Sequence, residues 1–417
     1  MRVLWITNTI FPAPSKVLDL AAPVVGGWMY GLADQLVAGK EIKLAVAATY
    51  QGMDLKVLDL EGIRYYLLPS RCAAGYQQHL EPLWQTITEE YQPDVIHIHG
   101  TEYLHGLACM RACQSHRYVI SIQGLVGVIA SYYYAGLTTR EIFKSITFRD
   151  LVRWDTIFHR KKNMARFASF EEEYLTRTKN VIGRTTWDYA RTKAINPALA
   201  YHYCNETLRD VFYSADKWDS QKKTDHVIFL SQAAYPVKGL HLVLKAVALL
   251  AVDFPNLKVR VAGHSLTNAS TLLDRMKRYG YGSYISSLIT DLALEDRVEF
   301  TGPLSGESMV AEYLSAHLFV CPSSIENSPN SIAEAQILGV PTIASYVGGV
   351  PDMICHGETG LLYRFEEVHM LAENIRRVFT DNQLAQHLSV QGIVAAEKRH
   401  DRRVNRDEMI AIYGRVK

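Results

Sequence analysis

Short apolar runs alternate with longer amphipathic segments along the chain, and few folds can accommodate this alternation. In the first half the runs are nearly continuous in Val, Ile and Leu, which is typical of parallel strands covered on both faces. We expect strands at residues 2–7, 42–48, 63–68, 94–99, 118–123 and 180–183. The segments between them, beginning with 27–39, have the length and polarity of helices that cover a sheet.

The same pattern starts again in the second half of the chain. Strands are expected at residues 227–232, 257–263, 297–302, 318–324 and 340–345. Residues 206–226 are polar, charged and poor in periodicity, so we expect a linker there. The sequence therefore predicts an α/β protein with two doubly wound, Rossmann-like domains, at 1–212 and 225–397. Because open α/β sheets bind ligands beyond their strand ends, the site is expected in a cleft between the two domains.

Charge and cysteine content exclude several functional classes. The 417 residues include 44 Lys or Arg and 43 Asp or Glu, and this balance disfavours a protein that coats nucleic acid. The six cysteines are too sparse for a disulfide scaffold and lack the paired spacing of a zinc site. No apolar run is long enough to cross a bilayer. We expect a reducing, cytoplasmic location and no nucleic-acid partner.

Two glutamates, Glu326 and Glu334, stand eight residues apart after a predicted strand. Glu326 falls in a loop, and Ser328, Pro329 and Asn330 are expected to start a helix that Ser328 or Asn330 caps. The helix N-terminus suits a diphosphate, and Glu334, one turn inside, can accept hydrogen bonds from a ribose diol. Glu326 would then face a sugar. The alternative is that both are surface or capping carboxylates.

Two further features suit an anionic ligand. Gly26 and Gly27 open the first predicted helix, where unpaired N–H groups attract anions and glycine permits close approach. An ordinary helix start explains the pair equally well, and the G-x-G-x-x-G spacing of nicotinamide enzymes is absent. Lys238 lies at a strand–helix junction and can neutralise a phosphate, or it is a solvated loop charge.

The segment around the two glutamates resembles the retaining glycosyltransferases of family four, which have the GT-B fold and an E-x(7)-E motif. Bacterial surface-polysaccharide glycosyltransferases share this layout. The resemblance follows the chain in order over nearly its whole length. It is carried by Glu326, Asn327, Ser328, Pro329, Asn330, Glu334, Ala335, Gly339 and Pro341, the GGVP turn at 348–351, and residues 26–27, 94–100, 238–239 and 356–363.

The resemblance implies that a hexosyl group passes from a nucleotide-diphosphate sugar to an acceptor hydroxyl with retained anomeric configuration. The C-terminal domain would hold the donor, with UDP slightly favoured, and the N-terminal domain would supply most acceptor contacts. A last helix at about 398–417 would pack back onto the N-terminal domain. Donor contacts are expected from Gly26, Gly27, Gln232, Lys238, Asn327, Ser328, Pro329, Asn330, Ser331 and Glu334, and catalytic roles from Glu326, Lys238 and Gln123.

No metal or other cofactor is expected. The chain contains no Asp-x-Asp triplet, with which the other large sugar-transferase fold holds a divalent cation. Lys238 and the helix dipole would instead stabilise the leaving diphosphate.

The sequence departs from the family pattern at two places. The arginine expected five residues before Lys238 is replaced by Ala233, or by Gln232 if the loop is shifted. The histidine that many relatives carry beside the donor sugar is here Gln123, which can donate a hydrogen bond but cannot take a proton. His99, at a predicted strand end, is a candidate for contacting the acceptor or the sugar, with a structural role as the alternative.

Residues 140–166 carry a net charge of +5, interleaved with aromatic and aliphatic side chains. This composition is typical of an amphipathic helix on anionic lipid, or of an N-domain helix with a solvated basic face. We expect peripheral membrane contact here and a lipid-linked glycan as the acceptor. Two other classes stay open: a non-catalytic nucleotide-sugar-binding or scaffold protein, and a sugar-nucleotide epimerase of similar fold.

Overall fold

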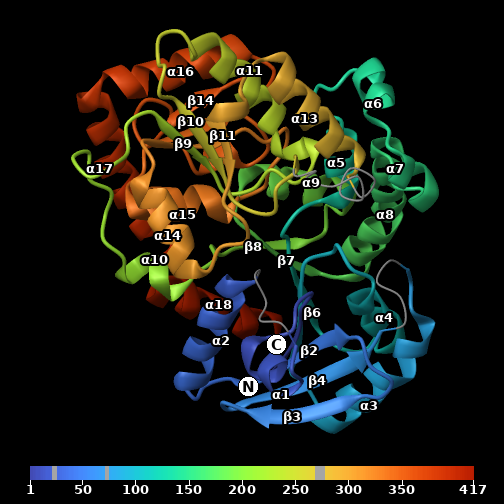
Figure 1. Ribbon diagram of the computed structural model, residues 1–417. Coiled ribbons are helices and arrows are strands. Elements are labelled where there is room, and N and C mark those ends of the chain that lie inside the picture. Colours follow the sequence, from blue (N-terminus) through green and yellow to red (C-terminus); the bar gives the residue numbers. More distant parts are fainter. Residues whose placement is uncertain (21–25, 71–74, 268–277) are drawn as a thin grey trace. The chain divides into compact units, whose positions relative to one another are not determined.

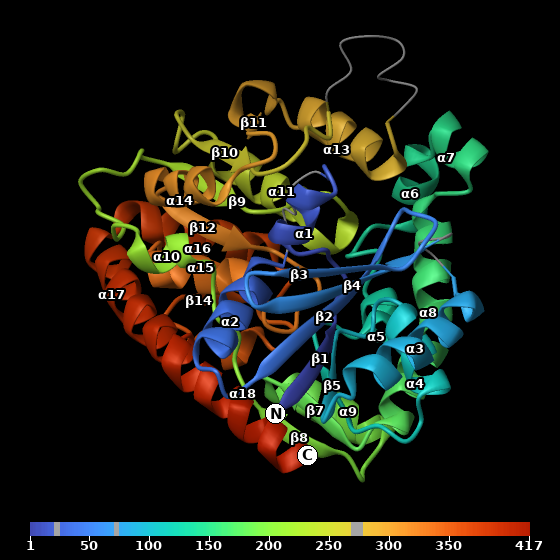
Figure 2. The same cartoon turned by 90° about the horizontal axis from the view of Figure 1, so that it is seen from below.

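The computed structural model describes residues 1–20, 26–70, 75–267 and 278–417. It confirms the predicted α/β class, because the chain forms two units that are each built on a largely parallel sheet with helices on both faces (Figures 1 and 2). The first unit comprises residues 1–127, 166–209 and 400–417, and the second residues 128–165 and 210–399. Residues 128–165, which the sequence assigned to the N-terminal range, thus group with the second unit.

The first unit has an eight-stranded sheet of order β3-β4-β2-β1-β5-β6-β7-β8, in which only the β3–β4 pair is antiparallel. Its strands are β1 (Arg2–Ile6), β2 (Lys43–Tyr50), β3 (Lys56–Leu60), β4 (Ile63–Pro69), β5 (Val95–His99), β6 (Tyr118–Ser121), β7 (Asn180–Gly183) and β8 (Ala200–Tyr203). The helices around it are α1 (Pro12–Val17), α2 (Gly27–Ala38), α3 (Glu81–Tyr91), α4 (His105–Ala112), α9 (Thr186–Ile195) and α18 (Arg402–Val416). All six predicted strands are present, and the two edge strands, β3 and β8, were not predicted.

The last helix, α18, is anchored in the core of the first unit and lies beside α2 (Figures 1 and 2). The indole N–H of Trp5 donates to the hydroxyl of Tyr413, 2.7 Å away, and that hydroxyl lies 2.7 Å from Nδ1 of His97. Because the indole can only donate, the hydroxyl hydrogen is left for His97. Burial lowers the pKa of His97 to about 3, so the ring is neutral and its Nε2–H faces Ser121 Oγ at 2.7 Å.

The second unit has a six-stranded parallel sheet of order β11-β10-β9-β12-β13-β14. Its strands are β9 (Val227–Leu230), β10 (Lys258–Val261), β11 (Val298–Phe300), β12 (Leu318–Cys321), β13 (Thr342–Ser345) and β14 (Leu361–Tyr363). The helices include α10 (Asp210–Ser214), α11 (Leu240–Leu250), α13 (Gly280–Asp291), α14 (Gly306–Ser315), α15 (Asn330–Leu338), α16 (Val368–Thr380) and α17 (Asn382–Arg399), with short 3-10 turns such as η2 (Pro236–Lys238). The five predicted strands are present, and β14 was not predicted.

Residues 140–166 do not form the single amphipathic helix that their composition suggested. They form α6 (Thr139–Ser145), α7 (Phe148–Arg153) and the first part of α8 (Ile157–Arg177). The chain breaks because Thr138 and Thr147 each make a capping box, with Glu141 and Asp150, which starts a new helix. The segment packs on the second unit, where α6 lies against α13. No helix of the described residues is both long and apolar enough to span a membrane.

Candidate active site

Two side chains predicted to act on the donor meet in the second unit. Lys238 ends η2 and Glu326 lies in the loop after β12, and the Lys238 Nζ is 2.6 Å from Glu326 Oε1. The two side chains are only 18% and 15% exposed. Burial by itself lowers the pKa of Lys238, but the Glu326 carboxylate outweighs this effect and raises the pKa above its usual value. Lys238 is therefore protonated at neutral pH.

The loop that carries Glu326 is held at several points. Ser323 Oγ donates to Glu326 Oε1 over 2.7 Å, so Ser323 and Lys238 bind the same carboxylate oxygen. The backbone N–H of Ser324 donates to Val237 O over 2.8 Å, which ties the loop to η2. These bonds fix the carboxylate and the ammonium group relative to each other before any ligand binds.

Two glycines allow this close packing. Gly239 has φ +71°, and a Cβ there would lie 1.9 Å from Pro322 O. Gly348 has φ +53°, and a Cβ there would lie 1.9 Å from Glu326 O, while the N–H of Gly349 donates to the same carbonyl over 3.0 Å. The GGVP turn therefore has a structural reason: only glycine lets this turn approach the Glu326 backbone.

Helix α15 begins at Asn330, directly after the Glu326 loop, and its N-cap is Pro329 without a side-chain cap hydrogen bond. The expectation that Ser328 or Asn330 caps this helix is therefore wrong, because the proline places the helix start one residue later than a Ser328 cap requires. Glu334 is the fifth residue of the helix, and its carboxylate lies 3.4 Å from the hydroxyl of Tyr313. A partly exposed carboxylate thus follows one turn after the helix N-terminus, as predicted.

The two residues that could stand in place of the family's arginine differ in exposure. Ala233 is buried at 3%, whereas Gln232 is exposed. Of these two residues, Gln232 is the one that can reach a ligand, and it brings no positive charge.

The glycine pair of the first unit makes room for a protein side chain. Gly26 is the N-cap of α2 with φ +87°, and a Cβ on Gly27 would lie 2.4 Å from Cγ of Arg209. The first turn of α2 thus packs against the stem of an arginine, which the sequence reading did not foresee because Arg209 is far away along the chain.

Gln123 follows β6 and is held by a buried ion pair of the first unit. Its Nε2 donates to Glu206 Oε1 over 2.9 Å, and Arg184 lies 2.8 Å from the same oxygen. Arg184 also donates to Ile122 O over 2.9 Å. The ion pair fixes the orientation of the Gln123 amide.

His99 is only 2% exposed. Its ring lies 3.9 Å from that of His97, 4.5 Å from Trp5 and 5.5 Å from Trp28, measured between centroids. Burial lowers its pKa well below the usual value, and neither ring nitrogen has a hydrogen-bond partner among the described residues. This apolar environment favours the structural alternative for His99.

Sequence reasoning missed Glu102, which lies just beyond β5. Its carboxylate accepts from Gly124 N over 3.1 Å and lies 3.4 Å from Asn8 Nδ2, so it links the carboxyl ends of β1, β5 and β6. Burial raises its pKa to about 7. Its place in the loop after a buried strand was the sequence signal that could have identified Glu102.

Residues 213–393 match the model of the family described as "Glycosyl transferases group 1". Among curated relatives, D-inositol 3-phosphate glycosyltransferase of Corynebacterium glutamicum is 32% identical over 151 residues, 36% of this chain and 34% of that protein. Exopolysaccharide phosphotransferase SCO2592 of Streptomyces coelicolor is 32% identical over 163 residues, 39% of this chain and 16% of that protein. The chain thus spans about a third or less of the length of these relatives.

Solved structures match the chain over nearly its whole length. Sucrose-phosphate synthase from Thermosynechococcus elongatus has a TM-score of 0.72 at 18% identity, covering 100% of this chain and 99% of that one. Anabaena HepE in complex with UDP and glucose has a TM-score of 0.67 at 16% identity, covering 99% of both chains. WaaG, a glycosyltransferase involved in lipopolysaccharide biosynthesis, has a TM-score of 0.63 at 13% identity, covering 97% of this chain and 98% of that one. At these identities the likeness shows the fold alone, which is GT-B.

The segment that matches this family contains one set of predicted site residues, among them the ion pair of Lys238 and Glu326. These residues lie in the loop after β9, in η2, in the loop after β12 and in the first turns of α15. The remaining candidates, Gly26, Gly27, His99 and Gln123, belong to the first unit and lie outside the matched segment.

Proposed function

We propose that this chain is a retaining glycosyltransferase of family four, which moves a hexosyl group from a nucleotide-diphosphate sugar to an acceptor hydroxyl. UDP is the favoured nucleotide and a lipid-linked glycan of surface polysaccharide synthesis the favoured acceptor. The observation that carries the proposal is the pair of Lys238 and Glu326 before the N-terminus of α15 in the segment that matches the group 1 family. The similarity to HepE, solved with UDP and glucose, and to WaaG, which is involved in lipopolysaccharide biosynthesis, supports the choice of donor and acceptor.

We assign separate roles to the paired side chains. As the bond to the sugar breaks, negative charge develops on the leaving phosphate and positive charge on the sugar ring. The ammonium of Lys238 has three N–H donors, so it can keep its hydrogen bond to Glu326 while it also donates to the phosphate. Lys238 and Ser323 both donate to Glu326 Oε1. The other carboxylate oxygen, Oε2, faces the sugar and stabilises its positive charge.

The remaining donor contacts follow from the start of α15. Residues 327–331 and the helix dipole hold the diphosphate, and Glu334 accepts hydrogen bonds from the ribose. Gln123 donates from its amide toward the reacting groups, while the donor phosphate takes the acceptor proton. Because these groups supply the charge stabilisation, no metal is needed, and turnover persists in excess EDTA. Complete loss in EDTA that magnesium or manganese reverses would contradict this part of the proposal.

The location proposed is the inner face of a membrane, in peripheral contact through α6 and α7. Five apolar side chains of this segment are more than half exposed: Phe143, Phe148, Leu151, Val152 and Trp154. Five exposed cations, Arg140, Lys144, Arg153, Lys162 and Arg166, lie within residues 140–166. Exposed aromatic and aliphatic side chains among cations suit an anionic lipid surface, where each cation contributes about 1 kcal/mol.

Incubation with nucleotide sugars, with and without acceptor, tests the proposal against its alternatives. Thermal shift with UDP, GDP and ADP first identifies the nucleotide, because a ligand that binds the folded state stabilises it. Turnover of the matching sugar nucleotide should then require a glycan acceptor. An epimerase would convert the sugar without acceptor, and a scaffold protein would bind but turn over nothing.

A further inference from the structure

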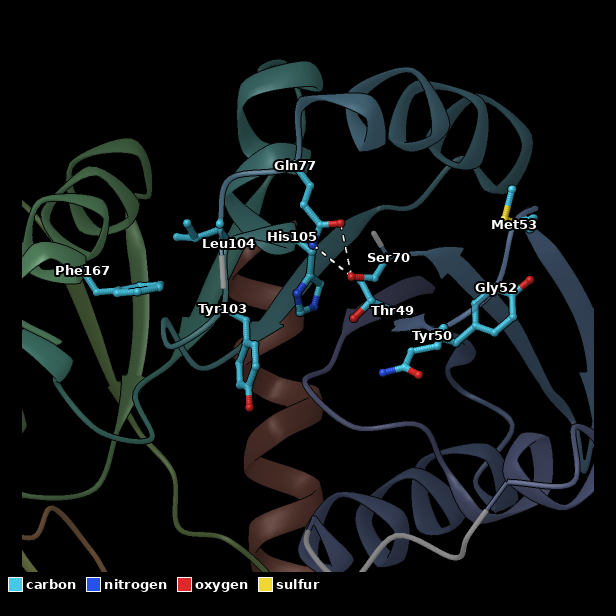
Figure 3. Close-up of a pocket in the computed structure, with 12 residues that line it drawn as sticks. Thr49, Tyr50, Gly52, Met53, Ser70, Gln77, Tyr103, Leu104, His105 and Phe167 are labelled. Atoms are coloured by element: carbon cyan, nitrogen blue, oxygen red, sulfur yellow. Dashed lines mark hydrogen bonds between the residues drawn. The ribbon is translucent and has the colours of Figure 1, made fainter. Parts of the chain in front are cut away.

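A pocket of about 610 Å³ opens in the first unit at the carboxyl ends of β2 and β4. Figure 3 shows its lining, which also includes the segment after β5 and one residue of α8. The volume is within the range of small-molecule sites. Because ligands of parallel sheets bind beyond the carboxyl ends of the strands, the position favours a binding site over a packing defect. None of the site residues predicted from the sequence lines it.

The described lining of the pocket carries no formal charge. Hydroxyl and amide groups come from Thr49, Ser70, Gln51 and Gln77, and ring faces from Tyr50, Tyr103, His105 and Phe167. His105 donates from Nε2 to Thr7 O over 3.1 Å, and burial lowers its pKa to about 4, so its ring is neutral at pH 7.

Polar and aromatic groups lie around Tyr103 (Figure 3). In the view of Figure 3, Phe167 lies on one side of Tyr103, and Thr49 and Ser70 lie on the other. Ser70 and Gln77 hydrogen-bond each other at 3.1–3.2 Å, which fixes their orientation. Tyr103 is 46% exposed, so much of its ring is available to a ligand.

We propose that this pocket binds a neutral sugar unit, and that it selects acceptor glycans without carboxylate or phosphate groups. The inference rests on the proposed function for the identity of the sugar as part of the acceptor. A sugar ring has an apolar C–H face that packs on an aromatic ring and a rim of hydroxyls that hydrogen-bond to amides and hydroxyls. A carboxylate or phosphate in the same place would lose its hydration without a cation among the described lining residues to replace it, which disfavours binding.

Saturation-transfer NMR on the full chain tests the pocket without any need for turnover. The probes are neutral trisaccharides of glucose, galactose and mannose, with trigalacturonate as the anionic counterpart. At least one neutral trisaccharide should bind. Trigalacturonate should bind at least about tenfold more weakly, because its carboxylates lose hydration in the pocket. A tenfold difference in affinity corresponds to about 1.4 kcal/mol. Tyr103→Ala and Phe167→Ala should each weaken the neutral sugar by about fivefold, as expected for loss of one aromatic face.

The matched control is Tyr189→Ala in α9, because Tyr189 is 48% exposed in the same unit but does not line the pocket. Unchanged sugar affinity in Tyr103→Ala and Phe167→Ala, binding of trigalacturonate as tight as that of the neutral sugars, or no neutral binding would each overturn the inference. UDP titration of the same samples separates the two proposals. UDP binding without sugar binding contradicts the pocket alone, whereas sugar binding without UDP binding contradicts the donor site.

Discussion

Lys238 and Glu326 are 88 residues apart in the chain, yet their side chains form an ion pair of 2.6 Å. The fold brings them together because β9 and β12, which precede them, are neighbouring parallel strands. Both residues follow the carboxyl end of their strand, where ligands of parallel sheets bind. A buried ion pair costs desolvation energy that it only partly recovers, so a pair at this position is better explained by ligand chemistry than by stability.

Replacing Glu326 should lower the rate of transfer, whereas replacing Lys238 should weaken the binding of UDP. Glu326→Gln removes the charge that stabilises the sugar cation, so kcat should fall about 10²–10³-fold while UDP affinity is retained. Lys238→Met removes the phosphate contact and should weaken UDP by about 1.5–3 kcal/mol. Calorimetric titration and steady-state kinetics measure the two effects. Lys245→Met, which removes a more exposed lysine paired with Glu141 in the same unit, is the matched control.

An equal loss of UDP affinity in Glu326→Gln and Lys238→Met would contradict this division of roles. It would indicate that the ion pair only holds the loop in place. Thermal denaturation of both variants identifies that case, because a structural pair lowers the stability of the protein in parallel with its affinity.

Glu334 should contribute to nucleotide binding rather than to the chemical step. Glu334→Ala is expected to weaken UDP by about 1.5–3 kcal/mol, the range for hydrogen bonds to a charged group. Glu373→Ala, at an exposed position of α16, removes a carboxylate elsewhere in the same unit. Calorimetry that finds the same UDP affinity in a folded Glu334→Ala protein would remove the ribose contact from the account.

The sequence predicted the central strands of both sheets because they are buried on both faces and read as continuous apolar runs. It missed β3, β8 and β14, which lie at sheet edges, where one side of the strand is not paired. The start and end of each central strand were predicted within a few residues.

The site was predictable where it follows local sequence and unpredictable where it depends on distant contacts. Glu326, Glu334 and Lys238 have local signatures of strand, loop and helix start. The packing of Arg209 on Gly27 and the approach of Gly348 to the Glu326 backbone join segments far apart in the chain, which periodicity does not reveal. Residues 128–165 pack on the second unit for the same reason, through contacts such as Tyr284 to Glu141 at 2.9 Å.

Membrane binding should depend on the exposed cations of α6, α7 and α8. Changing Arg140, Lys144, Arg153 and Lys162 to Glu should release the protein from vesicles that contain anionic lipid, as measured by sedimentation at low salt. Arg160 is left unchanged because it donates to Asp155 at 2.7 Å and holds the segment together. The matched control changes four lysines to Glu that are exposed outside this segment: Lys40, Lys179, Lys222 and Lys398.

Wild-type protein that stays in the supernatant at low salt would argue against membrane contact and in favour of a soluble acceptor. Equal release by both quadruple variants would mean that net charge, and not this surface, controls binding.

The buried carboxyl of Glu102 should make stability depend on pH. Its pKa is raised from 4.5 to about 7, so between these values the unfolded chain is ionised while the folded protein retains the proton. Stability is therefore lost as pH rises from about 4.5 to 7, by up to roughly 3 kcal/mol relative to Glu102→Gln. Urea denaturation of wild type and variant at pH 5 and pH 8 measures this difference, with Glu89→Gln on α3 as the exposed control. A difference between Glu102→Gln and wild type that is independent of pH would be the contrary result.

The anomeric configuration of the transfer product tests the account most directly. UDP-glucose, whose sugar is α-linked, is incubated with a panel of neutral and lipid-linked glycans, and proton NMR reads the coupling of the new glycosidic linkage. The account predicts an α-linked product that forms only when acceptor is present and that Glu326→Gln fails to make. A β-linked product, or conversion of UDP-glucose at the same rate without acceptor, would contradict it.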